Sequence, residues 1–120
     1  MAREMTDDAG QGGAEGRPAL PDGVEQLVSA ATDAAGFLKA LGHDGRLTIL
    51  CHLTGGPKSV TELENLLASR QAVVSQQLAR LRLEGLVSAR RDGQAIYYSI
   101  LDPRVTEMIG LLARLYARRD

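Results

Sequence analysis

Tryptophan is absent from this 120-residue chain, cysteine occurs once, and aromatic residues make up 3% of the sequence. The core must therefore be aliphatic, because too few rings are present to fill it. No apolar run approaches the ~18 residues of a membrane span, and no apolar segment near the N-terminus resembles a secretory signal. A single cysteine excludes an intrachain disulfide and a cysteine-based zinc knuckle. Together these absences predict a cytoplasmic protein.

The sequence also lacks an excess of charge of one sign, since its formal net charge is −1. The charges are nevertheless unevenly distributed. Residues 1–25 carry a net charge of −4, whereas residues 26–120 carry +3. Residues 70–94 contain five arginines and only two acidic residues. This positive cluster indicates a face suited to an anionic partner, although a solvated surface with scattered arginines would give the same count.

Composition separates the first 23 residues from the rest of the chain. They contain five of the 13 glycines and two of the four prolines, with almost no large apolar side chain. Such a segment cannot bury enough apolar surface to fold, so residues 1–23 are predicted to form a disordered acidic arm. Residues 24–120 have the size of one ordinary domain. We predict that they form a single folded unit.

Apolar residues recur at three- and four-residue steps in five segments, which is the pattern of amphipathic helices. Three sequence features predict where helices begin. Asp44 is a plausible N-cap, Ser59 and Glu62 fit the S-x-x-E capping box, and Asp102-Pro103 is typical of a helix start. The predicted helices are Val24–Leu41, Asp44–Leu53, a third from Ser59 through Leu67, a fourth from Ser69 or Arg70 to about Glu84, and a last one from Asp102.

Between the fourth and last helices the pattern changes to two β-prone segments, residues 86–91 and 94–100. Asp92-Gly93 lies between them and is a dipeptide favoured in tight hairpin turns, because glycine accepts a positive φ. The order is thus four helices, a hairpin and a helix. Two helices separated by one short turn, followed by a basic hairpin, predict a mainly α fold of the winged helix-turn-helix type.

The fourth helix is the candidate recognition helix, because its outward face carries amide and hydroxyl groups suited to base edges. The start of the third helix has free backbone N–H groups that can hold a phosphate, and the hairpin can meet the DNA backbone or the minor groove. Alternatively, the polar face of the fourth helix is simply exposed to solvent, and the arginines of the hairpin are edge-strand charges that prevent aggregation. The candidate DNA-binding residues are Ser59, Thr61, Arg70, Gln71, Ser75, Gln76, Gln77, Arg80, Arg90, Arg91 and Gln94.

Over about residues 36–116 the chain resembles the ArsR/SmtB family of small dimeric winged-helix repressors. The motifs that carry the resemblance are Ala40-Leu41-Gly42-His43 with residues 46–50, Val60-Thr61-Glu62-Leu63, residues 74–82, Glu84-Gly85-Leu86-Val87 and residues 91–98. The resemblance implies DNA readout by the fourth helix, a β-wing, and a homodimer through the first and last helices. Those two helices also carry an aliphatic stripe that a two-fold pairing would bury. Ser69-Arg70 and Gln77 depart from the family pattern, which would alter the operator sequence and leave the fold unchanged.

The chain is most similar to the subgroup that includes the SqrR, BigR, HlyU and NolR regulators. Its sulfide-responsive members pair a cysteine on the second helix with one near the end of the last helix. Cys51 matches the first, but Ala117 stands where the second is expected, so that bridge cannot form. Cys51 is then a buried small hydrophobe, a single thiol that forms a persulfide or mixed disulfide, or one ligand of a haem site with His52. Many family members bind metals through Cys on the third helix or through Asp and His on the last. This chain has no Cys on the third helix and no His on the last, so no metal site is predicted.

These observations predict a homodimeric transcriptional regulator that represses by occupying a palindromic promoter site on double-stranded DNA. A reactive sulfur species or an oxidant acting at Cys51 is the candidate inducer. The alternatives are a regulator without thiol sensing and a winged-helix module for protein interaction, which the acidic arm favours. No arrangement of nucleophile, base and acid indicates an enzyme.

Overall fold

The computed structural model describes residues 19–117. Within this range the chain divides after Ala35 into two compact units. That division falls later in the chain than the boundary after residue 23 that composition predicts, and the prediction for residues 1–18 lies outside the described range. In the described part of the chain no helix is long and apolar enough to cross a membrane.

The first unit contains helix α2 (Val24–Ser29) and the beginning of α3 (Ala31–Leu41), which continues into the second unit. The prediction of one continuous helix over Val24–Leu41 is wrong at Ala30. This residue has φ −101° and ψ 20°, outside the helical region, so it ends α2. None of the residues of α2 is buried, so burial of its side chains does not favour a continuous helix across Ala30.

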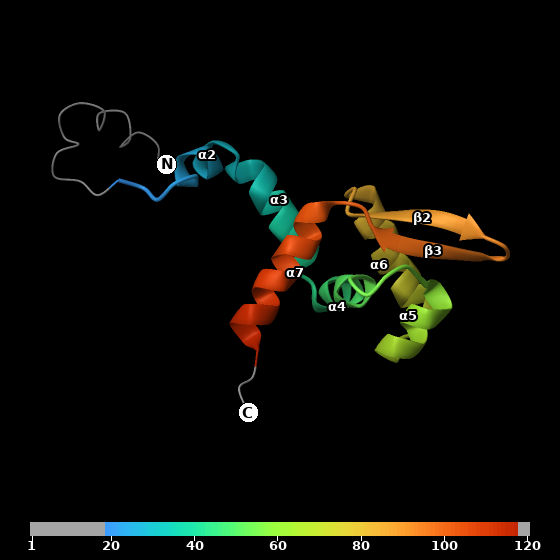
Figure 1. The fold of residues 1–120 in the computed structure, drawn as a ribbon. Helices are drawn as coiled ribbons and strands as arrows, with labels where there is room; N and C mark the ends of the chain where they lie inside the picture. The colour runs from blue at the N-terminus through green and yellow to red at the C-terminus, as the bar shows by residue number, and fades with distance from the viewer. Residues whose placement is uncertain (1–18, 118–120) are drawn as a thin grey trace. The chain divides into compact units, whose positions relative to one another are not determined.

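The second unit has the element order predicted for a winged helix-turn-helix, as Figure 1 shows. Four helices and one hairpin follow the end of α3, and a short extra strand precedes the helix-turn-helix. The elements are α4 (Asp44–Leu53), β1 (Lys58–Ser59), α5 (Val60–Leu67), α6 (Gln71–Leu83), β2 (Val87–Asp92), β3 (Ala95–Ile100) and α7 (Pro103–Tyr116).

The core of this unit is aliphatic, as the shortage of aromatic residues predicts. Leucine, isoleucine, valine and alanine from α3, α4, α5, α6, β2 and α7, with Leu86 from the loop before β2, make one cluster. Phe37 and Tyr98 pack against it half-buried. Among the described residues no polar or charged residue is buried. The buried residues are Ala40, Leu41, Ile49, Leu50, Leu53, Leu63, Val74, Leu78, Leu81, Leu86, Val87 and Val105.

Helix starts follow the sequence closely, with one shift. The capping box of Ser59 and Glu62 is present, and Asp102 caps α7 with Pro103 at its first position. The sequence predicts Asp44 as the N-cap of α4, but Asp44 is the first residue of the helix. His43 caps instead, because its Nδ1 atom accepts a hydrogen bond from the Gly45 N–H at 3.1 Å.

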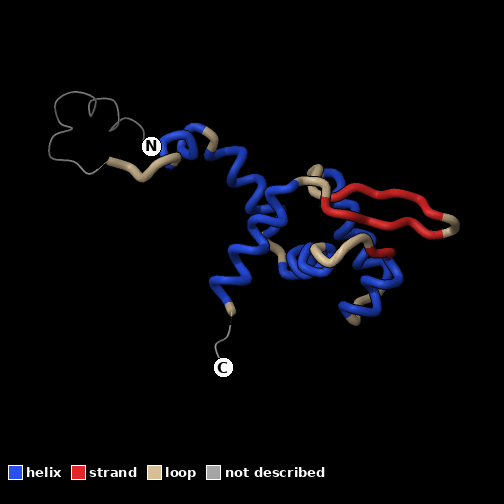
Figure 2. Tube along the Cα trace, in the orientation of Figure 1, coloured by secondary structure: helices blue, strands red, loops and turns tan. Residues whose placement is uncertain are grey.

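The sheet has three strands in the order β1–β3–β2, all antiparallel, where the sequence predicts only the hairpin (Figure 2). Lys58 and Ser59 pair with Tyr98 and Tyr97, and this joins the start of α5 to the hairpin. The turn is also shifted by one residue from the prediction. Asp92 pairs with Ala95, so the two loop residues are Gly93, with φ +68°, and its successor.

Candidate nucleic-acid interface

Helices α5 and α6 form the helix-turn-helix, and a three-residue turn joins them. Ala68 ends α5 in the left-handed conformation with φ 52° and ψ 42°, which allows the chain to reverse direction. Arg70 is the N-cap of α6 and makes no side-chain capping hydrogen bond. The first turn of α6 contains no acidic residue, so its free N–H groups carry the positive end of the helix dipole without compensation.

The two sides of α6 differ sharply in polarity. Val74, Leu78 and Leu81 are buried and hold the helix on the core. With about 100° between successive residues, Gln76 lies on the opposite side of the helix. It is exposed, as are Arg70, Gln71 and Ser75. Four of the predicted DNA contacts are therefore accessible, three on α6 and one at its N-cap.

Two other predicted contacts on α6 are occupied by neighbouring side chains. Gln77 is half-buried, and its Oε1 atom accepts a hydrogen bond from Nη1 of Arg46 on α4 at 3.4 Å. Arg80 is half-buried and forms an ion pair with Glu84, with 3.1 Å between Nε and Oε2. Their contacts with DNA stay predictions, and each would compete with a partner inside the protein.

The start of α5 is more crowded than the sequence suggests. Ser59 Oγ accepts a hydrogen bond from the Glu62 N–H at 3.2 Å, and Glu62 Oε1 accepts one from the Ser59 N–H at 2.8 Å. The Glu62 carboxylate therefore occupies the end of the helix where a phosphate is predicted. Ser59 keeps its hydroxyl hydrogen free to donate, and Thr61 is exposed. A phosphate contact here would use these hydroxyl groups.

The wing, defined as residues 87–100, presents its two arginines on opposite faces. Arg90 pairs with Tyr97 and Arg91 with Ile96, and successive residues of a strand point to opposite sides of the sheet. Arg91 lies on the same face as the core residue Val87, but farther toward the turn. Figure 1 shows the hairpin extending beyond the helices of this unit, and both arginines are exposed.

Strand β1 brings residues from the two predicted phosphate sites into one row. Ser59, at the start of α5, pairs with Tyr97, and Tyr97 pairs in turn with Arg90 on the other side. The three side chains therefore lie on one face of the sheet. Sequence reasoning misses this row because a two-residue strand is too short to show alternation. Gln94 lies exposed in the turn, at the end of the wing.

Cys51 lies on α4, and its side chain is exposed. The interpretation of this residue as a buried hydrophobe is therefore wrong. Partial burial nevertheless raises the pKa of the Cys51 thiol, because desolvation disfavours the thiolate. His52 is half-buried and follows it about 100° around the helix. The haem alternative stays a prediction.

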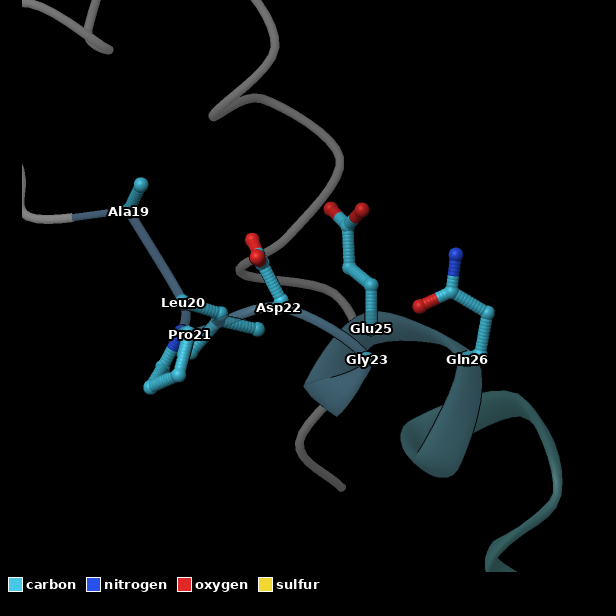
Figure 3. Close-up of a pocket in the computed structure, with 7 residues that line it drawn as sticks. All are labelled: Ala19, Leu20, Pro21, Asp22, Gly23, Glu25 and Gln26. Atoms are coloured by element: carbon cyan, nitrogen blue, oxygen red, sulfur yellow. The ribbon is translucent and has the colours of Figure 1, made fainter.

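Two further features bear on other kinds of site. Within residues 19–117, no group of three or more His, Cys, Asp or Glu side chains is arranged to hold a metal ion. In the first unit, a hollow of about 300 Å³ carries two carboxylates whose charge would repel a phosphate, and they point to the same side in Figure 3. The residues that line the hollow are Ala19, Leu20, Pro21, Asp22, Gly23, Glu25 and Gln26.

Known proteins of similar sequence and structure define the family of this chain. Residues 43–89 match the pattern of bacterial regulatory proteins of the arsR family. The chain is 44% identical to the HTH-type transcriptional regulator YgaV of Escherichia coli over 94 residues, which is 78% of this chain and 95% of that protein. It resembles the crystal structure of the transcriptional repressor BigR from Xylella fastidiosa with a TM-score of 0.76.

The BigR match has 33% sequence identity and covers 79% of this chain and 97% of the other. A homodimeric winged helix-turn-helix DNA-binding domain from Mycobacterium bovis matches with a TM-score of 0.64 and 27% identity, over 82% of this chain and 89% of that one. The fold and the exposed face of α6 define a winged-helix DNA-binding transcriptional regulator. The chain belongs to the ArsR family of bacterial regulatory proteins. The predicted family and fold class are confirmed, and the relatives are regulators, not enzymes.

Proposed function

We propose that this protein is a homodimeric repressor that occupies a palindromic promoter site, with α6 of each protomer in the major groove. The observation that carries the proposal is the exposed polar face of α6 beside a wing with two outward arginines. Gln76, opposite the buried stripe, would make paired hydrogen bonds with adenine. Gln71 and Ser75 both lie to one side of it around the helix, and Arg70 can reach a base or a phosphate.

The wing and the start of α5 would hold the protein on the DNA backbone. Arg90 and Arg91 leave the hairpin on opposite faces, so one can meet a phosphate while the other approaches the minor groove. Ser59 and Thr61 would add hydroxyl contacts. These contacts position the protein and carry little sequence information, whereas the α6 contacts select the sequence.

The dimer is supported by apolar side chains that one protomer leaves in solvent. Helix α7 has one fully buried residue, Val105, yet Leu111, Leu115 and Tyr116 on the same helix are 38%, 66% and 78% exposed. Leu38 on α3 is 53% exposed. A second copy would cover such a surface, as the homodimeric relative suggests. Two recognition helices would then meet half-sites about 34–36 Å apart.

Selection from a random-sequence DNA pool tests the proposal, followed by gel shifts of the selected duplex and of the protein's own promoter at two salt concentrations. We expect an enriched sequence with two-fold symmetry and a steep loss of affinity with salt. A protein-interaction module would enrich no sequence. Repression would appear as reduced transcription from the bound promoter in a purified system, and increased transcription would reverse the assigned sign.

We also propose that a reactive sulfur species modifies Cys51 and weakens DNA binding, since exposure of the side chain favours this role. The thiolate would attack a sulfane sulfur of a polysulfide. One S–S bond of the polysulfide breaks, a persulfide forms on Cys51, and the shortened polysulfide leaves with the electron pair. The raised pKa of the thiol makes this reaction slower than at an activated cysteine.

Mass spectrometry after polysulfide treatment, with the Cys51→Ser variant as control, tests the sensing proposal. We expect an adduct of one sulfur atom on the wild type and a parallel loss of DNA affinity that the variant does not show. An unmodified thiol, or equal DNA binding by modified and unmodified protein, would remove Cys51 from the mechanism and leave the DNA-binding proposal intact.

A further inference from the structure

Arg46, in the first turn of α4, connects the end of α3 with the recognition helix. Its Nε atom donates to the Ala40 carbonyl oxygen at 2.6 Å, and Nη2 donates to the Lys39 carbonyl oxygen at 3.2 Å. Its Nη1 atom donates to Gln77 Oε1 on α6 at 3.4 Å. One planar guanidinium thus contacts two helices besides its own, and all three of its nitrogen atoms are used.

The local electrostatics explain why an arginine occupies this position. A cation in the first turn of α4 interacts unfavourably with the dipole of that helix, so the stabilising contacts of Arg46 lie elsewhere. The last carbonyl groups of α3 have no partner within their own helix, and they form the negative end of its dipole. Arg46 donates charge-assisted hydrogen bonds to two of them, and the Lys39 oxygen also accepts one from the Gly42 N–H at 3.2 Å. Its third contact therefore fixes Gln77 relative to the end of α3.

Gln77 fits this role better than that of a free base reader. Its side chain is half-buried, whereas the neighbouring Gln76 is exposed. A Cβ atom added at Gly45 would lie 3.7 Å from Gln77 Nε2 and 3.2 Å from the His43 ring, so the amide packs against the start of α4. The side chain that would hold α6 by its flank is thus adjacent in sequence to the one that would read DNA.

We propose that Arg46 is a positioning residue, which sets the orientation of α6 in the groove through Gln77 without touching DNA itself. This inference rests on the proposed function, because it requires α6 to read bases. A hydrogen bond between Gln76 and a base edge forms only over a narrow range of distances. A small rotation of α6 therefore lowers the affinity for specific DNA. Binding to phosphates tolerates that rotation. The readout is therefore the ratio of affinities for specific and non-specific DNA.

The test compares Arg46→Lys with the wild type on two duplexes, one selected from a random pool and one scrambled to the same composition. Lysine keeps the charge but cannot supply the three-way fork. We expect about a tenfold loss of affinity for the selected duplex and less than about a twofold change for the scrambled one. Lys39→Ala is the matched control, since it removes a nearby charge and keeps the backbone carbonyl. It should leave the ratio unchanged.

A double-mutant cycle with Gln77→Leu separates positioning from direct readout. If Arg46 acts through Gln77, the two losses do not multiply, and the double variant resembles either single one. Gln77→Glu retains an acceptor for Arg46 and should retain the ratio, even if its charge weakens binding to both duplexes. This variant also tests the contact if Arg46→Lys proves too unstable to measure.

Equal losses on both duplexes, an unchanged ratio in Arg46→Lys, or losses that multiply would each overturn the positioning role. A failure of the proposed function looks different. In that case the wild type itself would enrich no sequence and bind the two duplexes equally.

Discussion

Helices α6 and α7 are nearly equal in length, yet they present opposite kinds of surface. Helix α6 buries three aliphatic residues and exposes glutamine and serine opposite them, with Leu83 exposed at its end, whereas α7 buries one and exposes leucine and tyrosine. A polar outer face suits a hydrated polyanion, and an apolar outer face suits another apolar surface. The difference teaches that one recognition surface and one assembly surface are divided between two helices.

The two helices also begin differently. Asp102 caps α7 and forms an ion pair with Arg104, with 2.6 Å between Oδ2 and Nη2. Helix α6 begins at Arg70 without a side-chain cap and without an acidic residue in its first turn. A capped start stabilises a helix by itself, whereas an open start leaves N–H groups for an anion. The helix starts therefore repeat the division seen on the outer faces.

The largest expected effect is at α7. Leu115→Glu places a charge in the surface that the second copy would cover, and we expect a monomer that binds its operator at least about 100-fold more weakly, because the two half-sites no longer act together. Light scattering and gel shifts measure the two effects. Leu83→Glu is the control on α6, where Leu83 is 83% exposed. This variant should leave the dimer mass unchanged. A dimeric Leu115→Glu would refute the assembly role of α7.

Next in size is the loss of a base contact from α6. Gln76→Ala should cost about 1–3 kcal/mol on the preferred site and relax the base choice at one position, because a paired hydrogen bond is removed. Affinity measured for a set of duplexes that vary at that position shows both effects. If affinity and preference both persist, α6 does not read the sequence through this residue.

A smaller and less selective effect is expected at the wing. Arg91→Ala should weaken binding to all sequences alike and lower the slope of log affinity against log salt by about one, since one phosphate contact is lost. Titrations of selected and scrambled DNA at several salt concentrations measure the slope. Because Arg90 leaves the opposite face, Arg90→Ala shows which face of the wing meets the backbone. An unchanged slope in both variants would place the wing away from DNA.

The smallest expected effect concerns the start of α7. The hydrogen bonds and charge of Arg104 hold the pKa of Asp102 below its usual range. Its contribution to folding stability is thus complete above about pH 4 and is lost as the pH falls through the lowered pKa. Since Arg104 is 65% exposed, Asp102→Asn should cost no more than about 1 kcal/mol at pH 7.

Denaturant unfolding of the wild type and Asp102→Asn at pH 7 and pH 3 measures this difference. The gap between the two proteins should narrow at the lower pH. Asparagine retains the capping hydrogen bond, so the two proteins differ in the carboxylate charge. A gap in unfolding free energy that stays constant between pH 7 and pH 3 would show that this charge contributes nothing.

Much of the fold could be predicted from short-range patterns. The capping box at Ser59, the Asp102-Pro103 start and the aliphatic steps of α6 depend on residues within one or two turns, and they appear where expected. The break at Ala30 and the cap at His43 were not visible in the same way. Each concerns the residue at which a helix begins or ends, which sequence patterns fix only to within about one or two residues.

The candidate site was less predictable, because its geometry depends on partners far apart in the chain. Four of the expected readers on or beside α6 are exposed, but Gln77 is bonded to Arg46, 31 residues away. Helical periodicity places Gln77 on a flank without showing which neighbour lies there. Cys51 falls on an apolar spacing, yet its side chain is exposed, because the packing of α4 decides which positions of the stripe are covered.

The sequence by itself determined the order of the helices and hairpin from α4 to α7, the aliphatic character of the core and the helix that would read DNA, because spacing, caps and turn residues act over a few residues. Only the tertiary structure decided that β1 joins the start of α5 to the wing, that Arg90 and Arg91 point apart, and that Arg46 bridges α3 and α6. These features arise from strand register and helix packing. Both are set when distant segments meet and bury a shared core.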